Sequence, residues 1–104
     1  MSADSNRVES ATCAFTIPPD ETGLYTWRPQ YPIRLTGLVL PLRSGCDLVS
    51  LTIGNRHIAI HAARRFARFD DGALAGEDVV VRLHNDTAST ESGAFALIYE
   101  RDLP

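Results

Sequence analysis

Apolar and polar residues alternate with a period of two along much of this chain, a pattern typical of β-strands with one buried face. The clearest case is the segment 47–61, DLVSLTIGNRHIAIH, in which two alternating runs flank Gly54-Asn55. A two-residue connection between antiparallel strands needs positive φ values, which glycine and asparagine tolerate. The segment is therefore predicted to form a β-hairpin. The opposed pairs expected on its apolar face are Ile53 with Arg56, Leu51 with Ile58 and Val49 with Ile60.

Five other segments carry a strand pattern between proline, glycine and polar turn residues. They are Cys13–Ile17, Leu24–Arg28, Ile33–Leu40, Val79–Leu83 and Ala94–Arg101. In the third of these, Gly37 is predicted to mark a β-bulge or a close backbone approach. Ile33, Leu35 and Val39 are predicted to share one face of that strand. The polar stretch Asn85–Gly93 is predicted to be an exposed loop.

The segment Ala62–Phe69, AARRFARF, is compatible with two structures. Its apolar residues could form one face of a short helix that stops at Asp70-Asp71-Gly72. They could equally belong to an extended connection that places Phe66 and Phe69 in the core. The interpretation adopted is irregular structure or a single helical turn.

The chain has 104 residues, near the common size of one domain. Residues 1–12, MSADSNRVESAT, are polar and are predicted to form a flexible N-terminal arm, or alternatively an arm that becomes ordered only on a neighbouring subunit. Residues 13–104 are predicted to form a single domain. Six to eight short strands with recurrent turns and almost no helix indicate an all-β fold, an antiparallel β-sandwich or small jelly roll.

The composition narrows the possible partners and compartment. The net charge is −3 and the isoelectric point is near 5.5, so a general nucleic-acid binder is disfavoured. All ten basic residues are arginine, which reflects either a GC-rich coding bias or arginine used to pair with carboxylates at interfaces. No secretory or membrane-spanning segment is visible. We expect a protein made in the cytoplasm and not secreted, with Cys13 and Cys46 as reduced thiols; a disulfide is the open alternative.

Three histidines are the candidates for a metal site. His57 and His61 would share one face of a helix, but on a strand four residues span about 13 Å, too far for one metal ion. His84 lies at the end of a predicted strand, with no cysteine at ligand spacing. The histidines are therefore interpreted as structural, and neither a metal nor another cofactor is expected.

Candidates for catalysis are equally sparse. The chain has no G-x-S-x-G nucleophile motif, and Cys46 lies in a predicted turn. Asp70-Asp71 and Glu77-Asp78 are carboxylate pairs without the alternating ligands of a calcium loop, and they are interpreted as solvated turns. We therefore expect no catalytic residue and no enzymatic activity.

Two clusters are candidates for contacts with a partner. The candidate interface residues are Tyr25, Trp27 and Tyr31 in an aromatic cluster, and Arg56, Arg64, Arg65 and Arg68 in a basic cluster. The basic cluster fits a solvated edge, a subunit interface or, against the acidic net charge, a nucleic-acid site. The aromatic cluster fits core packing, an interface or a glycan site.

The order of elements between Arg28 and Tyr99 carries a resemblance to a known group of proteins. The elements are the segment Arg28-Pro29-Gln30-Tyr31-Pro32, the strand up to Pro41, the hairpin around Ile53-Gly54-Asn55, the Ala/Arg/Phe stretch, the strand Val79–Leu83 and a closing strand with Phe95. This order resembles the small β-sandwich proteins that decorate, cement or form spikes on phage particles, many of them trimeric. The resemblance lies in the fold pattern, and no functional residue is carried over from it.

The resemblance implies a non-enzymatic virion structural protein, a capsid decoration or cement protein. Its expected partners are copies of itself, with a homotrimer favoured, and the major capsid protein or other virion subunits. The alternative is a binding module of the same fold that recognises a glycan or protein through the loops around Tyr25–Tyr31 or Asn85–Gly93. A metal-dependent enzyme or regulator built on the histidines is the third hypothesis.

Overall fold

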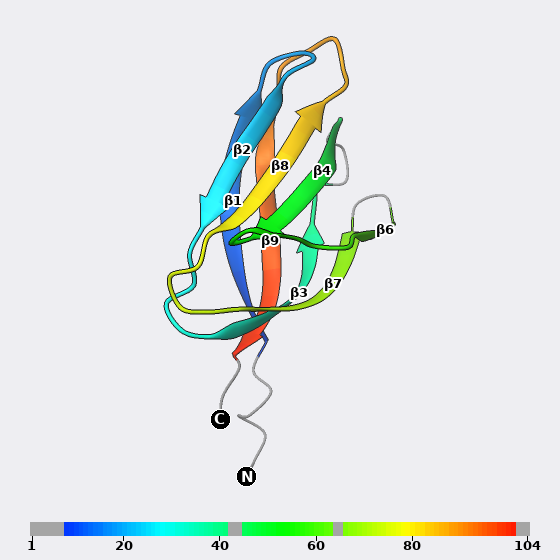
Figure 1. Ribbon diagram of the computed structural model, residues 1–104. Coiled ribbons are helices and arrows are strands. Elements are labelled where there is room, and N and C mark those ends of the chain that lie inside the picture. Colours follow the sequence, from blue (N-terminus) through cyan, green and yellow to red (C-terminus); the bar gives the residue numbers. More distant parts are fainter. Residues whose placement is uncertain (1–7, 42–44, 64–65, 102–104) are drawn as a thin grey trace.

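The structure, a computed structural model, describes residues 8–41, 45–63 and 66–101. These residues form nine strand segments and no helix (Figure 1). The segments are β1 (Val8–Ile17), β2 (Thr22–Trp27), β3 (Ile33–Val39), β4 (Cys46–Ile53), β5 (Arg56–His57), β6 (His61–Ala63), β7 (Phe66–Ala73), β8 (Val79–Asn85) and β9 (Glu91–Arg101). The predicted all-β fold is confirmed; β5 lies in the second arm of the predicted hairpin, and β6 and β7 are the two strands that were not predicted.

The strands form two packed antiparallel sheets. The five-stranded sheet has the order β1-β9-β3-β7-β6, and the four-stranded sheet has the order β2-β8-β4-β5. The apolar side chains between the sheets make one core, in which Phe95, Leu35 and Leu51 are almost completely buried. This arrangement is an antiparallel β-sandwich, because each sheet covers the apolar face of the other.

The strands with the cleanest alternation behave as predicted. In β9, Phe95, Leu97 and Tyr99 point into the core while the residues between them face outward. Phe15 and Ile17 likewise point into the core from β1. This strand ends at Ile17 because the next residue, Pro18, has no backbone N–H to donate to the ladder.

The hairpin prediction is confirmed near its turn. Gly54 has a φ of +60°, and Ile53 pairs with Arg56. The predicted pairing of Val49 with Ile60 is wrong for two reasons. The register of β4 shifts between Leu48 and Ser50, which leaves Val49 51% exposed, and the chain beyond β5 crosses to the other sheet to form β6.

The predicted irregularity at Gly37 is confirmed as a shift in the register of β3 between Leu35 and Gly37, against both of its neighbours. The predicted position of Val39 on the buried face is wrong. The shift turns Val39 outward, where it is 38% exposed, and turns Leu38 into the core.

The interpretation of Ala62–Phe69 as irregular or helical is wrong. His61–Ala63 form β6, and β7 begins at Phe66 and pairs with it. Asp70-Asp71-Gly72 continue β7 instead of ending a helix. A neighbouring strand supplies the ladder hydrogen bonds here, and this pairing overrides the local composition.

The predicted N-terminal arm is too long. Val8–Thr12 belong to β1, where they pair with β9 as far as Val8 with Glu100. Residues 1–7 lie outside the described residues. The predicted loop Asn85–Gly93 is also too long, because Asn85 ends β8 and Glu91 begins β9.

Candidate functional site

The outer face of the five-stranded sheet carries rows of uncharged side chains on neighbouring strands. Thr12, Ala96, Val39 and Phe66 are register partners across β1, β9, β3 and β7, and Ala14 pairs with Ala94 in a parallel row. We call Thr12, Ala14, Val39, Phe66, Ala94, Ala96 and Ile98 the flat face. All seven side chains are exposed or half-buried, and most are small.

Gly37 keeps this face flat. A Cβ added to Gly37 would lie 3.1 Å from the tip of the Phe66 ring, so the ring lies across the glycine and covers its backbone. The guanidinium of Arg68 lies 5.8 Å from the centroid of the same ring. Phe66 is therefore held against the sheet, presenting a broad aromatic surface instead of a projecting side chain.

Charged side chains lie at one end of the flat face. Arg34 pairs with Asp70 at an Nε–Oδ1 distance of 3.2 Å, and Glu100 is the register partner of Arg34 on β9. The apolar rows are thus bordered by charge, which resembles the layout of an interface core with a polar rim.

The structure places two of the aromatic interface candidates inside the sandwich. Tyr25 lies edge-on to Phe95 with ring centroids 5.7 Å apart, and Trp27 lies against Tyr99 at 4.9 Å. Both side chains are half-buried, and burial raises the pKa of Tyr25. Their main role is therefore packing between the sheets, one of the uses that the sequence left open.

The third aromatic candidate, Tyr31, belongs to a polar network that closes one end of the sandwich. Its hydroxyl donates to Glu9 Oε1 at 2.6 Å, and Tyr99 donates to the same oxygen at 3.2 Å. Arg101 donates to Glu9 Oε2 at 2.7 Å, and its guanidinium lies 4.1 Å from the centroid of the Tyr31 ring. The hydrogen bond from Tyr31 is the main cause that lowers the pKa of Glu9.

A cavity opens beside this network. It has a volume of about 230 Å³, and its lining residues are Trp27, Arg28, Gln30, Tyr31 and Tyr99. Aromatic rings next to a guanidinium and an amide give the combination of apolar and hydrogen-bonding surface that small polar ligands use.

Of the four arginine candidates, the structure describes Arg56 and Arg68, and these two make separate contacts. Arg56 donates to the carbonyl of Gly72 at 2.8 Å and lies 3.8 Å from Glu77 Oε1. Arg68 contacts Phe66. Arg64 and Arg65 lie outside the described residues. Arg56 thus ties the hairpin to β7, and its charge is neutralised locally.

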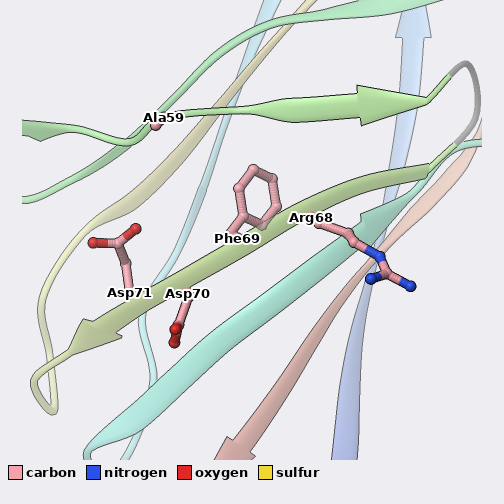
Figure 2. A pocket seen from close by; sticks show the side chains of 5 residues that line it. All are labelled: Ala59, Arg68, Phe69, Asp70 and Asp71. Carbon is pink, nitrogen blue, oxygen red and sulfur yellow. The ribbon is translucent and has the colours of Figure 1, made fainter.

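Arg68 also borders a second cavity, of about 380 Å³ (Figure 2). Its lining residues are Ala59, Arg68, Phe69, Asp70 and Asp71. Figure 2 shows Phe69 and Asp71 projecting from β7 toward the segment that carries Ala59, whereas Asp70 projects to the other side. Asp70 and Asp71, expected in a solvated turn, are therefore strand residues beside an open sheet edge.

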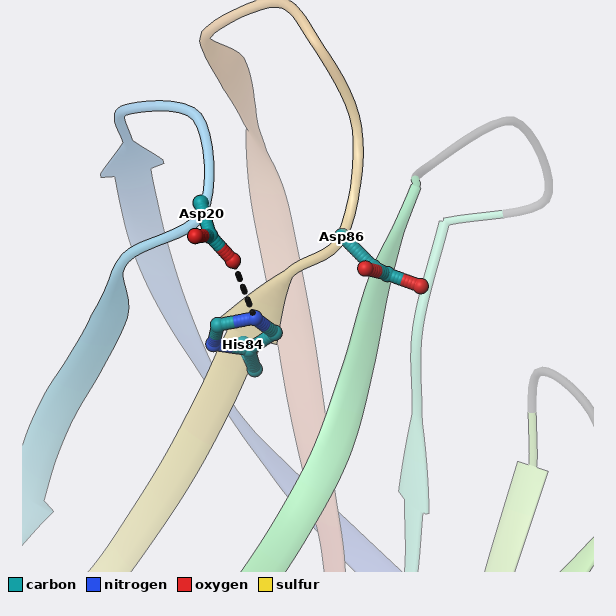
Figure 3. A group of neighbouring side chains, drawn as sticks. All are labelled: Asp20, His84 and Asp86. Atoms are coloured by element: carbon teal, nitrogen blue, oxygen red, sulfur yellow. Dashed lines mark ion pairs between the residues drawn. The ribbon is translucent and has the colours of Figure 1, made fainter.

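The sequence analysis did not predict a cluster of metal-ligand-type side chains at the end of the sandwich opposite the Glu9 network. Asp20, His84 and Asp86 place one ligand atom each within 4.8 Å of the others (Figure 3). His84 is at the end of β8, as predicted, but Asp20 comes from the turn after β1. The only signal in the sequence is that a polar turn and a polar strand end both carry ligand-type residues, and nothing local says that they meet.

Asn85 holds these two segments together. Its side chain is fully buried, and its amide nitrogen donates to the carbonyl oxygens of Ile17, Pro18 and Ser89 at 2.8, 3.2 and 2.8 Å. Its backbone carbonyl accepts a hydrogen bond from Asp20 N at 2.9 Å. The positions of Asp20 and Asp86 are therefore determined by a buried polar residue between them in space.

Comparison with known protein families, curated proteins and solved structures finds no match to this chain. Among the described residues, no helix is long and apolar enough to cross a membrane.

Proposed function

We propose that this chain is a non-enzymatic virion structural protein, a decoration or cement protein that acts as a homo-oligomer. A trimer is the expected stoichiometry, and the major capsid protein or another virion subunit is the expected second partner. The virion setting rests on the resemblance in the order of elements described above. Self-association rests on the surface of the sandwich.

The flat face is the observation that supports self-association. Val39 and Phe66 lie side by side on it, each 38% exposed, in one cross-strand row with Ala96 and Thr12. Burying the apolar rows of this face gains hydrophobic free energy, and small side chains lose little conformational entropy on contact. Arg68 is exposed in the same row as Gly37 and Ile98, so its charge would need a partner in the interface. In a trimer the flat face of one subunit would contact a different surface of the next, because a closed ring of three needs a heterologous interface.

The experiment is the mass in solution, measured by light scattering over a range of concentrations. A monomer has a mass of 11.4 kDa, and we expect a multiple of that value. Val39→Glu places a carboxylate at the centre of the flat face and is expected to return the protein to a monomer. Val49→Glu is the matched control, because Val49 is an exposed valine on the other sheet, and its mass is expected to equal that of the wild type.

Three outcomes contradict the proposal. The first is a wild-type protein that stays monomeric at every concentration. The second is equal dissociation by Val39→Glu and Val49→Glu, which would exclude the flat face as the specific contact. The third is dissociation on removal of residues 1–7, with Val39→Glu remaining oligomeric, which would move the contact to the N-terminal segment.

The second candidate function is a binding module, and the cavity lined by Trp27 and Tyr31 is the observation that favours it. Trp27 is the single tryptophan, so its fluorescence reports directly on that cavity. A saturable change on titration with simple sugars, abolished in Gln30→Ala and retained in Gln30→Glu, would support glycan recognition. A fluorescence spectrum that no sugar changes would exclude glycan binding at this cavity and leave assembly as the one proposed role.

A further inference from the structure

We propose that Asp20, His84 and Asp86 form a binding site for one divalent transition-metal ion of the zinc class. Two segments far apart in the sequence supply the ligands: the turn between β1 and β2 carries Asp20, and the end of β8 carries His84, followed by Asp86 (Figure 3). A metal ion bound here would join the β1–β2 turn to the end of β8. This proposal is independent of the proposed virion function.

The spacing of the first two ligands already suits a metal ion. His84 Nε2 and Asp20 Oδ1 are 3.3 Å apart. Two atoms that bind one zinc ion at about 2.0–2.1 Å with tetrahedral angles lie about 3.4 Å apart. The ion would therefore take its place between Nε2 and Oδ1 with little movement of either side chain.

The third ligand needs a modest rotation. The ligand atom of Asp86 lies within 4.8 Å of those of Asp20 and His84, and a rotation of its side chain would adjust it to ligand spacing. Asp86 is exposed and follows the end of β8, so its side chain is free to turn. The Asn85 side chain accepts hydrogen bonds from the backbone N and the hydroxyl of Thr87, so the residues on both sides of Asp86 are held together.

The imidazole of His84 is oriented for binding through Nε2. The Thr22 hydroxyl lies 2.9 Å from Nδ1, and Thr22 is the register partner of His84 on β2. When Nδ1 carries the hydrogen and donates it to Thr22, the Nε2 lone pair faces the Asp20 carboxylate. Two acceptors at that distance need a cation or a proton between them, and a partner on the second ring nitrogen is how metal-binding histidines are usually held.

The donor set selects the class of ion. One imidazole nitrogen and two carboxylate oxygens are ligands for zinc and related first-row ions, whereas calcium and magnesium sites are built from oxygen. Three protein ligands leave a fourth tetrahedral position for water or for a group from a partner. The two carboxylates neutralise the charge of a divalent ion. The ion in turn removes the repulsion between Asp20 and Asp86.

The test is calorimetric titration of the untagged full-length chain with Zn²⁺, together with the thermal midpoint in zinc and in chelator. We expect one ion per chain and a midpoint that rises with zinc concentration, because an ion that binds only the folded state stabilises it. His84→Gln and Asp86→Asn are expected to abolish both effects. Asp86→Asn should not destabilise the protein in chelator, because it removes a like charge beside Asp20.

Two further variants separate this site from general zinc binding. His57→Gln removes an exposed histidine on β5 and is expected to bind zinc like the wild type. Thr22→Val removes only the partner of Nδ1 and is expected to weaken zinc binding about tenfold, with Thr22→Ser restoring it. Zinc binding that survives His84→Gln, or that falls equally in His57→Gln, would overturn the proposal.

Discussion

Glu9 and Arg101 lie at the two ends of the described chain, yet their side chains form an ion pair with an Oε2–Nε distance of 2.7 Å. The antiparallel pairing of β1 with β9 brings them together, because Val8 pairs with Glu100. Glu9 also accepts hydrogen bonds from Tyr31 and Tyr99, which come from outside β1. One carboxylate therefore joins the first strand, the last strand and the segment between β2 and β3.

Glu9 should make the protein sensitive to acid. The pKa of Glu9 is lowered from 4.5, mainly by the hydrogen bond from Tyr31, so the unfolded chain binds a proton more tightly than the folded one. The stability that Glu9 contributes is therefore present above pH 4.5 and is lost as the pH falls through its lower folded pKa. We expect Glu9→Gln to be less stable than the wild type at neutral pH, with the difference shrinking in acid.

Urea denaturation at a series of pH values measures this effect. Glu21→Gln is the control, because the side chain of Glu21 is exposed, and its stability curve should run parallel to that of the wild type. A Glu9→Gln protein that keeps the wild-type difference at every pH would contradict the role assigned to this carboxylate.

Tyr99 should ionise only at high pH. Burial is the main cause that raises the pKa of Tyr99 from 10.0 to about 12. The contribution of the neutral phenol to stability is therefore complete below pH 10 and is lost as the pH rises through about 12. Ultraviolet titration of tyrosinate should show a late step that Tyr99→Phe removes. A titration curve that Tyr99→Phe leaves unchanged above pH 10 while the protein stays folded would exclude this environment.

Strong local patterns predicted much of the fold correctly. The strict alternation of Phe95, Leu97 and Tyr99 identified a core strand, and Gly54-Asn55 identified a turn that needs a positive φ. Both signals depend only on neighbouring residues, which is why the sequence was sufficient. Val39 was assigned to the wrong face because a single register shift at Gly37 reverses every later side chain, and the pattern does not show which residue is displaced.

The remaining errors come from contacts between distant segments. The stretch Val8–Thr12 has the composition of a solvated arm, because only Glu9 and Ala11 turn inward. The strand that pairs with it, β9, is more than 80 residues away in the sequence. The flat face and the Asp20–His84 pair were invisible for the same reason. Each requires the order of strands in the sheets, which hydrophobic periodicity does not contain.

Substitution of Gly54 should destabilise the protein more than substitution of a glycine within a strand. Its φ of +60° lies in the left-handed region, and a Cβ there would lie 2.7 Å from Glu77 Oε2. We expect Gly54→Ala to destabilise the protein by about 1–2 kcal/mol. Gly72→Ala is the control, because its Cβ would have its nearest contact at 3.7 Å, and it should change the stability by no more than about 1 kcal/mol. Equal losses in the two variants, measured by urea denaturation, would contradict the turn geometry.

Asn85 should be the most sensitive polar residue of the described core. Its amide satisfies three backbone carbonyls, and its Oδ1 accepts from the backbone N and the hydroxyl of Thr87 at 2.9 and 2.7 Å. Asn85→Ala leaves buried groups without partners and is expected to cost about 2–4 kcal/mol in urea denaturation. Asn85→Asp should be at least as harmful, since it directs a carboxylate oxygen at carbonyl oxygens.

The matched control for Asn85→Asp is Asn55→Asp, which makes the same change at an exposed turn residue and should be nearly neutral.

The Asn85 variants also test how the Asp20 turn is positioned. If Asn85 holds the β1–β2 turn against the end of β8, its loss should increase hydrogen exchange at the amides of Asp20 and Thr87 before that of the β9 core. Uniform exchange across all three regions would mean that Asn85 acts on global stability alone.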